Sequence, residues 1–300
     1  KYLNLTGGKD LDIKYKYANS LLKMGNIDEA KLVFSDLLKA APENKEYKRM
    51  VESCEFARMQ LAKENIHPIK NQELLNSEQS EFGLAWLDEQ LIFASKRLVR
   101  NYSTIHGRTN QGFSEIYSSS FDNVNGIYSN PTILKGSINS PFNDGTFSYN
   151  PGTGIAYFAQ CKKKPEKCEI YTSTFEKNKW TNVKLLALDQ SEYNFAHPSI
   201  NAAGNMLYFA SDLPGSIGGK DIWRVSISGS TITGSPENLG ESINTDKDDM
   251  FPLILGDSIL LFSSEGHIGM GGLDVFYSKI IEGIFDEPVN VGVPINSTSD

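Results

Sequence analysis

Apolar residues follow two different periods along the chain, and the change falls near residue 70. From residue 11 to residue 64 they recur in steps of three and four, which is typical of one face of an α-helix. Gly25-Asn26 and Pro42 interrupt this pattern, because glycine favours helix ends and proline cannot continue a helix. The pattern therefore predicts three helices, and we place a helical domain at residues 1–70.

From residue 80 onwards the chain is a series of short strand-like runs that repeat. Four of these runs contain a phenylalanine near their end, at Phe93, Phe158, Phe209 and Phe262. A second run follows each of them and opens with an acid, at Glu115, Glu169, Asp221 and Asp274. Self-similar units of roughly 40–50 residues with about four strands each are typical of a β-propeller. The sequence therefore predicts an α + β multidomain protein, with a β-propeller of four visible repeats over residues 71–300.

A connecting segment repeats as well and bears on the number of blades. Asn238–Thr245 is echoed by Asn290–Ser297, and Leu134–Ser140 is a looser copy. In this register Asp300 matches Asp248, where another repeat begins. We expect the propeller to be incomplete at its C-terminal end and to have five or more blades in the full protein, because an unclosed ring exposes strand edges. The alternative is a ring that closes with four blades.

The helical region carries small, aromatic and turn residues at fixed spacings. They are Ala18, Leu21, Gly25, Ile27, Ala30, Phe34 and Pro42. This spacing resembles the tetratricopeptide (TPR) repeat, although that pattern has an aromatic residue in place of Ile27 and a small one in place of Leu37. Only one repeat is complete, so the resemblance implies a helical unit that leans on the next domain or on upstream sequence.

The TPR resemblance also implies a partner-binding surface. In that family, set positions of the first helix face a concave groove that binds peptides. The matching residues here are Asp12, Tyr15, Asn19 and Lys23. A mixture of aromatic, amide and charged side chains suits peptide recognition. The alternative is an ordinary helix surface.

The strand repeats resemble the WD40-like repeat of TolB-type propellers. The resemblance rests on Leu207–Asp212 (LYFASD), followed by Gly218–Trp223 (GGKDIW). A TPR-like region joined to such a propeller resembles PorE-like members of the OmpA family, which are periplasmic proteins associated with the type IX secretion and gliding machinery. This resemblance implies a non-enzymatic scaffold in the periplasm, associated with the outer membrane, that links an outer-membrane secretion or gliding machine to the cell wall. Its expected partners are envelope proteins, and peptidoglycan only through a C-terminal domain that these residues do not include.

Composition and charge exclude several other classes of protein. Hydrophobic residues make up 39% and charged residues 22%, as in an ordinary folded chain. The 37 acidic residues outnumber the 29 Lys and Arg residues, and no basic stripe is present, so we expect no nucleic-acid partner. No run approaches the roughly 20 apolar residues of a membrane-spanning helix, so we expect no transmembrane segment.

Two of the three cysteines lie at the ends of one short loop. Cys161 and Cys168 follow and precede strand-like runs that can pair as a hairpin, which brings the two sulfurs close enough to bridge. A disulfide indicates an oxidising compartment such as a periplasm. A metal-binding knuckle and two free thiols are the alternatives, and the knuckle lacks a second Cys or His pair at ligand spacing.

The residues that carry chemistry do not form a recognisable catalytic set. The four strand-opening acids occupy equivalent places in different blades, so we expect them to cap turn amides rather than to form the carboxylate pair of a glycosidase. Gly215–Lys220 departs from a P-loop at Pro214, and the sequence contains neither HExxH nor G-x-S-x-G. The acidic loop Thr245–Asp249 lacks the glycine and the terminal Glu of an EF-hand. We therefore expect no enzymatic activity, no metal and no cofactor.

The remaining candidate site is the mouth of the propeller channel. His197 precedes Pro198 at the start of a blade's first strand, which lines the channel in propellers. Asp248 and Asp249 stand at the start of the next blade. We take His197, Asp248 and Asp249 as channel-mouth candidates. The residues matched to Pro198 differ in chemistry, which argues against a shared catalytic centre; they are Gly83, Phe147 and Pro252.

Two alternative functions remain open at this point. One is a glycan-binding or glycan-processing propeller that uses the channel mouth, with Trp180 and Trp223 as aromatic platforms. Trp223 occupies the position of Phe276, so we expect it in the core between blades, and its burial would remove the platform. The other alternative is a TolB-like partner of envelope lipoproteins.

Overall fold

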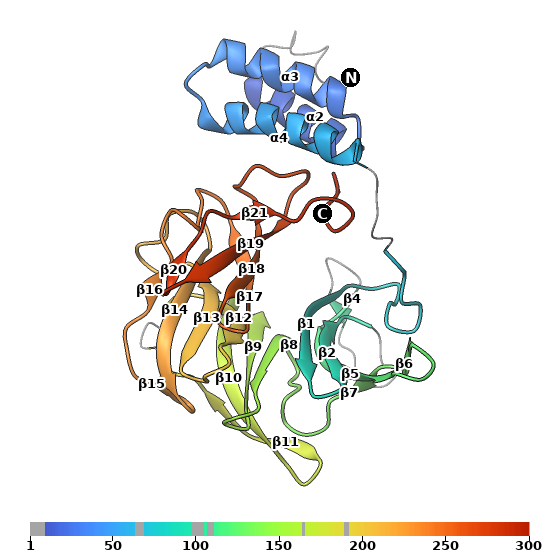
Figure 1. Ribbon diagram of the computed structural model, residues 1–300, viewed down its shortest axis with the longest axis vertical. Helices are drawn as coiled ribbons and strands as arrows, with labels where there is room; N and C mark the ends of the chain where they lie inside the picture. Colours follow the sequence, from blue (N-terminus) through green and yellow to red (C-terminus); the bar gives the residue numbers. More distant parts are fainter. Residues whose placement is uncertain are drawn as a thin grey trace.

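The computed structural model describes residues 10–63, 69–97, 105–106, 111–163, 166–188 and 192–299. Three helices come first, namely α2 (Leu11–Lys23), α3 (Ile27–Ala40) and α4 (Lys45–Leu61). Four β-sheets follow in chain order, and Figure 1 shows them side by side below the helices. We call these sheets blades 1 to 4. The three predicted helices and the predicted β-propeller are therefore confirmed.

The helices begin and end where the side chains satisfy the backbone. Asp10 accepts hydrogen bonds from the amides of Asp12 and Ile13 at 3.0 and 3.2 Å, which caps the start of α2. Asn44 caps α4 in the same way through the amide of Tyr47. The small residues that the sequence places between the helices are fully buried with Phe34, so the helices pack closely.

The four blades have the following strands. Blade 1 contains β1 (Glu81–Leu87), β2 (Gln90–Ser95), β5 (Glu115–Asp122), β6 (Ile127–Tyr128) and β7 (Thr132–Ile133). Blade 2 contains β8 (Asn143–Asn150), β9 (Ile155–Lys163), β10 (Glu166–Glu176) and β11 (Lys179–Leu185). Blade 3 contains β12 (Phe195–Ile200), β13 (Met206–Ser211), β14 (Asp221–Ser228), β15 (Thr231–Ile232) and β16 (Glu237–Asn238). Blade 4 contains β17 (Asp249–Leu255), β18 (Ile259–Ser264), β19 (Asp274–Ile281), β20 (Ile284–Phe285) and β21 (Val289–Asn290), and β3 (Ile105–His106) pairs with β4 (Gln111–Gly112) outside the blades.

The repeated phenylalanines occupy matching places in the four blades. Each lies on the second strand and is at most 1% exposed. Each faces an aromatic residue across the strand pair, and the pairs are Phe93 with Tyr117, Phe158 with Tyr171, Phe209 with Trp223 and Phe262 with Phe276. The repeat found in the sequence is thus a repeat of packing positions.

An asparagine of the connecting segment explains why that segment repeats. In three blades its side-chain oxygen accepts from a backbone amide of the third strand, and its nitrogen donates to the carbonyl of the same residue. The asparagines are Asn139, Asn244 and Asn296, and they clamp Ile116, Ile222 and Val275. Each asparagine thereby pairs a strand amide and adds a second hydrogen bond to a carbonyl that already accepts from the backbone amide of Leu134, Leu239 or Val291.

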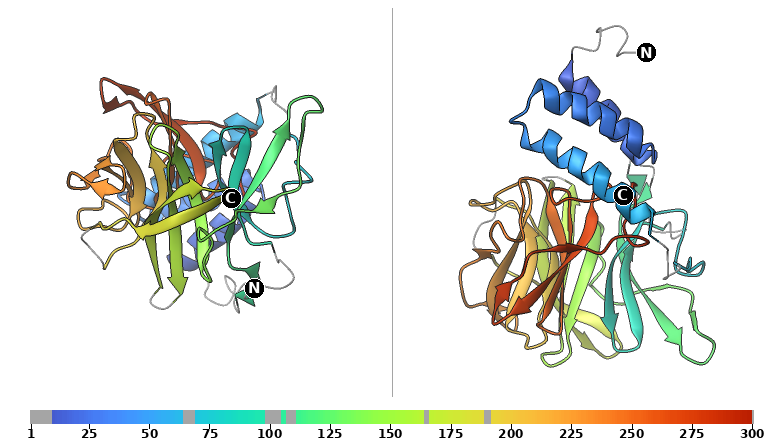
Figure 2. Two further views of the ribbon diagram at one scale, coloured as in Figure 1. Left: turned by 90° about the horizontal axis from the view of Figure 1, so that it is seen from below. Right: turned by 45° about the horizontal axis from the view of Figure 1, so that its top comes forward.

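The helices pack on one end of the propeller, over blade 4 (Figure 2, right). Met270, from the loop between β18 and β19, is fully buried in the core of the three helices. Arg49 donates to the carbonyl of Glu265 at 2.9 Å, and Lys247 lies 3.5 Å from the carboxylate of Glu46. The expectation that the helical unit leans on the next domain is therefore confirmed, with Met270 as the apolar contact.

Candidate functional site

A cavity of about 1400 Å³ occupies the channel and opens between blades 4 and 1. The first strands of all four blades line it, as expected for a propeller channel. We call the face of blade 1 that points away from blade 2, and the face of blade 4 that points away from blade 3, the outer faces. Blade 1 contributes Leu91 and Phe93 from its outer face, and blade 4 contributes Leu261 and Val275 from its own. The row of four blades thus has two outer faces, one at each end, and both border this cavity.

Contacts between successive blades follow one rule. In blades 1 to 3, the residue that precedes the repeated phenylalanine and the residue that precedes its aromatic partner both pack on the following blade. In blades 1, 2 and 3 these pairs are at most 6% exposed; they are Ile92 with Ile116, Tyr157 with Ile170, and Tyr208 with Ile222. In blade 4 the same positions hold Leu261 and Val275, which are only partly buried. Blade 4 therefore presents an apolar face that has no blade against it within the described residues.

The outer face of blade 1 is covered by the segment that joins it to the helices. Leu75 packs on Leu91, Phe93 and Tyr117, and is 8% exposed. Arg97 fixes this segment by donating to the carbonyl of Leu75 at 2.5 Å. Its guanidinium also lies over the rings of Phe93 and Tyr117, at 5.5 and 5.1 Å from their centroids. Residues 69–80 thus cover the outer face of blade 1.

A backbone irregularity recurs at one position of each first strand. Gly83, Thr146, His197 and Phe251 all have a positive φ, between 45° and 66°, at a shift in strand register. Residues other than glycine seldom adopt this conformation, and those that do cluster at binding sites. The alignment also corrects one match made from the sequence, because the residue of blade 1 equivalent to Pro198 is Leu84 rather than Gly83.

His197 lines the channel, as predicted, and its ring is held in place. It stacks on the ring of Phe251 with centroids 3.7 Å apart. Its Nδ1 accepts from the amide of Phe251 at 3.4 Å. Burial lowers the pKa of His197 to about 3, and the cation of Lys220 acts in the same direction. The imidazole is therefore neutral at physiological pH.

The two acids predicted beside His197 do not face the channel as free carboxylates. Asp248 accepts from the amide and the ammonium of Lys220, at 2.9 and 3.1 Å. Asp249 is fully buried and accepts from the amide and hydroxyl of Thr245, at 2.6 and 2.8 Å. We correct both assignments, because neither acid lines the two cavities: Asp248 binds the loop before β14, and Asp249 binds its own turn.

The Asp249 arrangement is itself a repeat that sequence reasoning missed. Ser140 donates to Asp144 through its amide and hydroxyl, and Ser77 does the same to Glu81. The signal was present as Ser or Thr followed four residues later by an acid at the start of a first strand. Burial raises the pKa of Asp144 to about 7, and the pKa of Asp249 also rises because of burial.

The four strand-opening acids divide into two kinds. Asp221 accepts from the amides of Ile217 and Gly218, and Asp274 accepts from that of Gly271, so the predicted capping is confirmed for these two. Glu169 instead pairs with Lys162 and Lys167, at 3.0 and 2.9 Å. Glu115 accepts from the hydroxyl of Tyr117. The prediction is wrong for the two glutamates, whose hydrogen bonds come from side chains.

The four residues proposed for a TPR groove lie in different surroundings. Asp12 is exposed and pairs with Lys16 at 2.7 Å, while Lys23 is exposed at the end of α2. Asn19 is partly buried. Tyr15 contacts the rings of Phe34 and Tyr47 and donates its hydroxyl to Glu46. Tyr15 is therefore part of the packing between helices, because α4 lies beside it.

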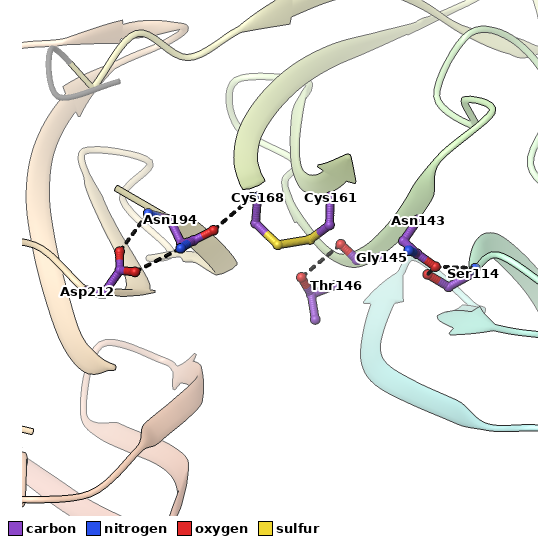
Figure 3. Close-up of a disulfide and its surroundings, with 8 residues drawn as sticks. All are labelled: Ser114, Asn143, Gly145, Thr146, Cys161, Cys168, Asn194 and Asp212. Carbon is purple, nitrogen blue, oxygen red and sulfur yellow. Dashed lines mark hydrogen bonds between the residues drawn. A yellow bond between two sulfur atoms is a disulfide. The ribbon is translucent and has the colours of Figure 1, made fainter. Parts of the chain in front are cut away.

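Cys161 and Cys168 are bonded in the structure, with an S–S distance of 2.00 Å (Figure 3). They are direct partners across β9 and β10. Figure 3 also shows Asn194, which accepts from the amide of Cys168 and donates to Asp212 of blade 3. The disulfide thus joins a hairpin that is also tied to the next blade. Cys54 is buried in the helical core.

The aromatic platforms proposed for glycan binding are absent at Trp180 and Trp223, which are 1% and 6% exposed. Trp180 packs in the core between blades 1 and 2, and Trp223 between blades 2 and 3. Sequence reasoning overlooked Trp86, which is 58% exposed and lines the large cavity. The available signal was a pair of large apolar residues, Leu84 and Trp86, on either side of the small Ala85, because alternate residues of a strand share a face.

Among the described residues, no group of three or more His, Cys, Asp or Glu is arranged to hold a metal ion. No helix in the described part of the chain is long and apolar enough to cross a membrane.

Comparisons with known proteins give distant structural neighbours. No family model and no curated protein matches the chain. TolB from Acinetobacter baumannii is 17% identical over 75% of this chain and 47% of its own, with a TM-score of 0.44. The Bacteroides ovatus xyloglucan PUL GH43B is 12% identical over 74% of this chain and 41% of its own, at 0.43. A puromycin-hydrolysing peptidase of Mycobacterium tuberculosis is 15% identical over 73% and 32%, at 0.41. The chain thus spans less than half of each of these proteins, and its propeller fold rests on its own strand topology.

Proposed function

We propose that this chain is a non-enzymatic protein-interaction scaffold of the cell envelope. The observation that carries the proposal is the joint between the helices and blade 4, where Met270 is buried in the helical core. The polar contacts of Arg49 and Lys247 surround this apolar contact and fix its direction. Two folds that commonly bind proteins are thereby held in one orientation, which is what a scaffold requires.

The proposed compartment is the periplasm, in association with the outer membrane. The Cys161–Cys168 disulfide supports it, because such bonds persist in oxidising compartments. The finer assignment, a PorE-like protein of the OmpA family with a TPR region that serves a type IX secretion or gliding machine, rests on the sequence resemblance. On this proposal the partners are envelope proteins. Peptidoglycan is bound only through a further domain.

We also propose that a fifth blade covers blade 4 in the full protein. The open face of Leu261 and Val275 supports this, because its three counterparts are each buried by the blade that follows. A version extended by the next roughly 50 encoded residues should bind less of a hydrophobic dye such as ANS and melt at a higher temperature. An unchanged dye signal and melting temperature would contradict the fifth blade.

The scaffold proposal is tested by separating the two folds. Met270→Asp places a charge in the helical core, while Met24→Asp is a matched control at a side chain that is 75% exposed. We expect the purified chain to retain a defined envelope protein from the native membrane fraction, identified by crosslinking and mass spectrometry. Met270→Asp should weaken this retention at least tenfold, and Met24→Asp should not. Equal retention by both variants contradicts the proposal, as does substrate turnover that a single acid substitution abolishes.

Glycan binding is the second candidate function, and Trp86 is the observation that favours it. An exposed indole on a channel wall can stack on a sugar ring. Titration with xylan- and peptidoglycan-derived oligosaccharides should then change the tryptophan fluorescence, because the other two tryptophans are buried. Trp86→Ala should remove the change. A TolB-like partnership with envelope lipoproteins is distinguished by whether the crosslinked protein is a lipoprotein.

A further inference from the structure

A second cavity, of about 260 Å³, lies where blades 1, 2 and 3 meet, beside the disulfide. Its polar walls include Lys96, Asn143 and His197, and its apolar walls include Phe82, Ala159 and Ala196. None of the described residues that line it carries a carboxylate. The cavity therefore offers hydrogen-bond donors next to a small apolar pocket.

The amide of Asn143 is oriented by its neighbour. Its Oδ1 accepts from the backbone amide of Ser114 at 3.1 Å (Figure 3). The hydroxyl of Ser114 lies 3.4 Å from the same oxygen. Because the oxygen is engaged with blade 1, the Nδ2 group is the end of the amide that remains to donate to a ligand.

The ring of His197 is oriented in a similar way. Its Nδ1 accepts from the amide of Phe251, so in the neutral imidazole the proton resides on Nε2. Burial holds the pKa of His197 at about 3, which keeps this tautomer neutral. Stacking on Phe251 fixes the plane of the ring. His197 therefore presents an N–H donor and brings no acceptor of its own into the cavity.

We propose that this cavity binds a carboxylate group, which Lys96, Asn143 and His197 recognise through three N–H donors. Lys96 supplies the single positive charge, which matches a monovalent carboxylate. The apolar walls take one small or medium-sized side chain, since the volume suits a single residue. The carboxylate is either the C-terminus of a peptide or that of a free small acid.

This inference is independent of the proposed scaffold function. The open face of blade 4 and the helical joint lie elsewhere in the molecule, and neither is needed for the cavity to bind an anion. An envelope partner can be retained while the carboxylate fails to bind, and the reverse can also occur. The two experiments therefore fail separately.

The test uses acetyl-Ala-Leu with a free carboxylate, the same peptide as its C-terminal amide, and acetate, measured by calorimetry. We expect the free-carboxylate peptide to bind and the amide to bind at least tenfold more weakly. Lys96→Met should weaken binding at least tenfold, whereas Lys179→Met, at an exposed lysine of β11, should leave it unchanged. His197→Phe keeps a stacking ring without the donor and should weaken binding several-fold.

The outcomes separate the two sources of the carboxylate. Binding of acetate as tight as that of the peptide, with the same dependence on Lys96, assigns the site to free acids. Tighter binding of the peptide assigns it to peptide C-termini. The proposal is overturned if neither probe binds, if the amide binds as well as the acid, or if Lys96→Met and Lys179→Met behave alike while both variants keep the native melting temperature.

Discussion

Blades 1 and 4 stand at the two ends of the same row of repeats, and their outer faces are treated differently. Blade 1 has Leu91, Phe93 and Tyr117 on its outer face, covered by Leu75 and tied down by Arg97. Blade 4 has Leu261 and Val275 on its outer face, with a large cavity in front of them. The comparison shows that one end of the row has a substitute for a neighbouring blade, formed by Leu75 and Arg97, and that the other end has none within the described residues.

The composition of the two faces agrees with this difference. The outer face of blade 1 carries the repeated phenylalanine. In blades 2, 3 and 4 the corresponding face packs on the preceding blade. The outer face of blade 4 corresponds to the face on which the following blade packs in blades 1, 2 and 3. It carries two aliphatic side chains, Leu253 and Leu255, which are 37% and 43% exposed. A cluster of exposed apolar side chains on a sheet face marks an interaction site. The two outer faces are thus of opposite kinds, and in the part of the chain that the structure describes only the face of blade 1 is covered.

The largest expected effect separates the two sides of blade 4. Leu260 is fully buried against blade 3, while its neighbour Leu261 faces the cavity. Leu260→Ala should lower the free energy of unfolding by about 2–5 kcal/mol, and Leu261→Ala by about 1 kcal/mol or less. Denaturant unfolding of both variants measures the difference. Equal losses would show that blade 4 is covered on both sides.

The second prediction concerns the cover of blade 1. Leu75→Ala should lower the free energy of unfolding by about 2–3 kcal/mol, because Leu75 buries the aromatic face. Leu74→Ala, one residue earlier and 47% exposed, should change it by no more than about 0.5 kcal/mol. If the two leucines prove equivalent, residues 69–80 do not cover blade 1 in solution and the comparison fails.

The third prediction tests the residue that fixes this cover. Arg97→Met keeps much of the apolar stem but loses the hydrogen bond to Leu75 and the contacts with two aromatic rings. We expect a loss of about 1–2 kcal/mol in the free energy of unfolding. Proteolysis between residues 69 and 80 should become faster in the same variant. Unchanged proteolysis would assign Arg97 no part in holding the segment.

Much of this architecture was predictable from the sequence because each blade repeats the same packing positions. Phe93, Phe158, Phe209 and Phe262 each sit in a strand pair, and local strand patterns encode that pairing. The contact of Met270 with the helices was not predictable, because it joins residues that are far apart in the sequence. Asp248 and Asp249 were misassigned for a related reason, since spacing alone does not tell whether a carboxylate faces a channel, another loop or its own turn.

The residue that covers the outer face of blade 1 was not predictable from the sequence either. Leu75 lies in a stretch without a clear period, so nothing marked it as a core residue. His197 was singled out by its position, yet its role as an oriented N–H donor depends on the amide of Phe251, in the next blade. Contacts between blades therefore set the chemistry of the channel, while contacts within a blade set the fold.

The smallest expected effect is a pH dependence confined to blade 1. Burial alone raises the pKa of Glu81, but hydrogen bonds from Ser77 and Ser95 and the charge of Arg97 together lower it below its usual value. A carboxylate whose pKa is lowered on folding contributes stability above its unfolded pKa, and this contribution is lost as the pH falls through the folded value. Glu81→Gln should therefore lower the free energy of unfolding by up to about 1 kcal/mol at pH 7, and by less at about pH 3.

The pH dependence that comes from Glu81 can be separated from that of the buried Asp144. Burial shifts the pKa of Asp144 in the opposite direction, so its contribution is greatest in acid and is lost as the pH rises towards 7. The comparison of Glu81→Gln with wild type at each pH cancels that contribution, because both proteins retain Asp144. The difference between the two proteins should stay level from pH 7 down to about pH 5 and shrink only below it, where an unfolded glutamate begins to take up a proton. A constant difference would mean that Glu81 stabilises blade 1 through its shape rather than its charge.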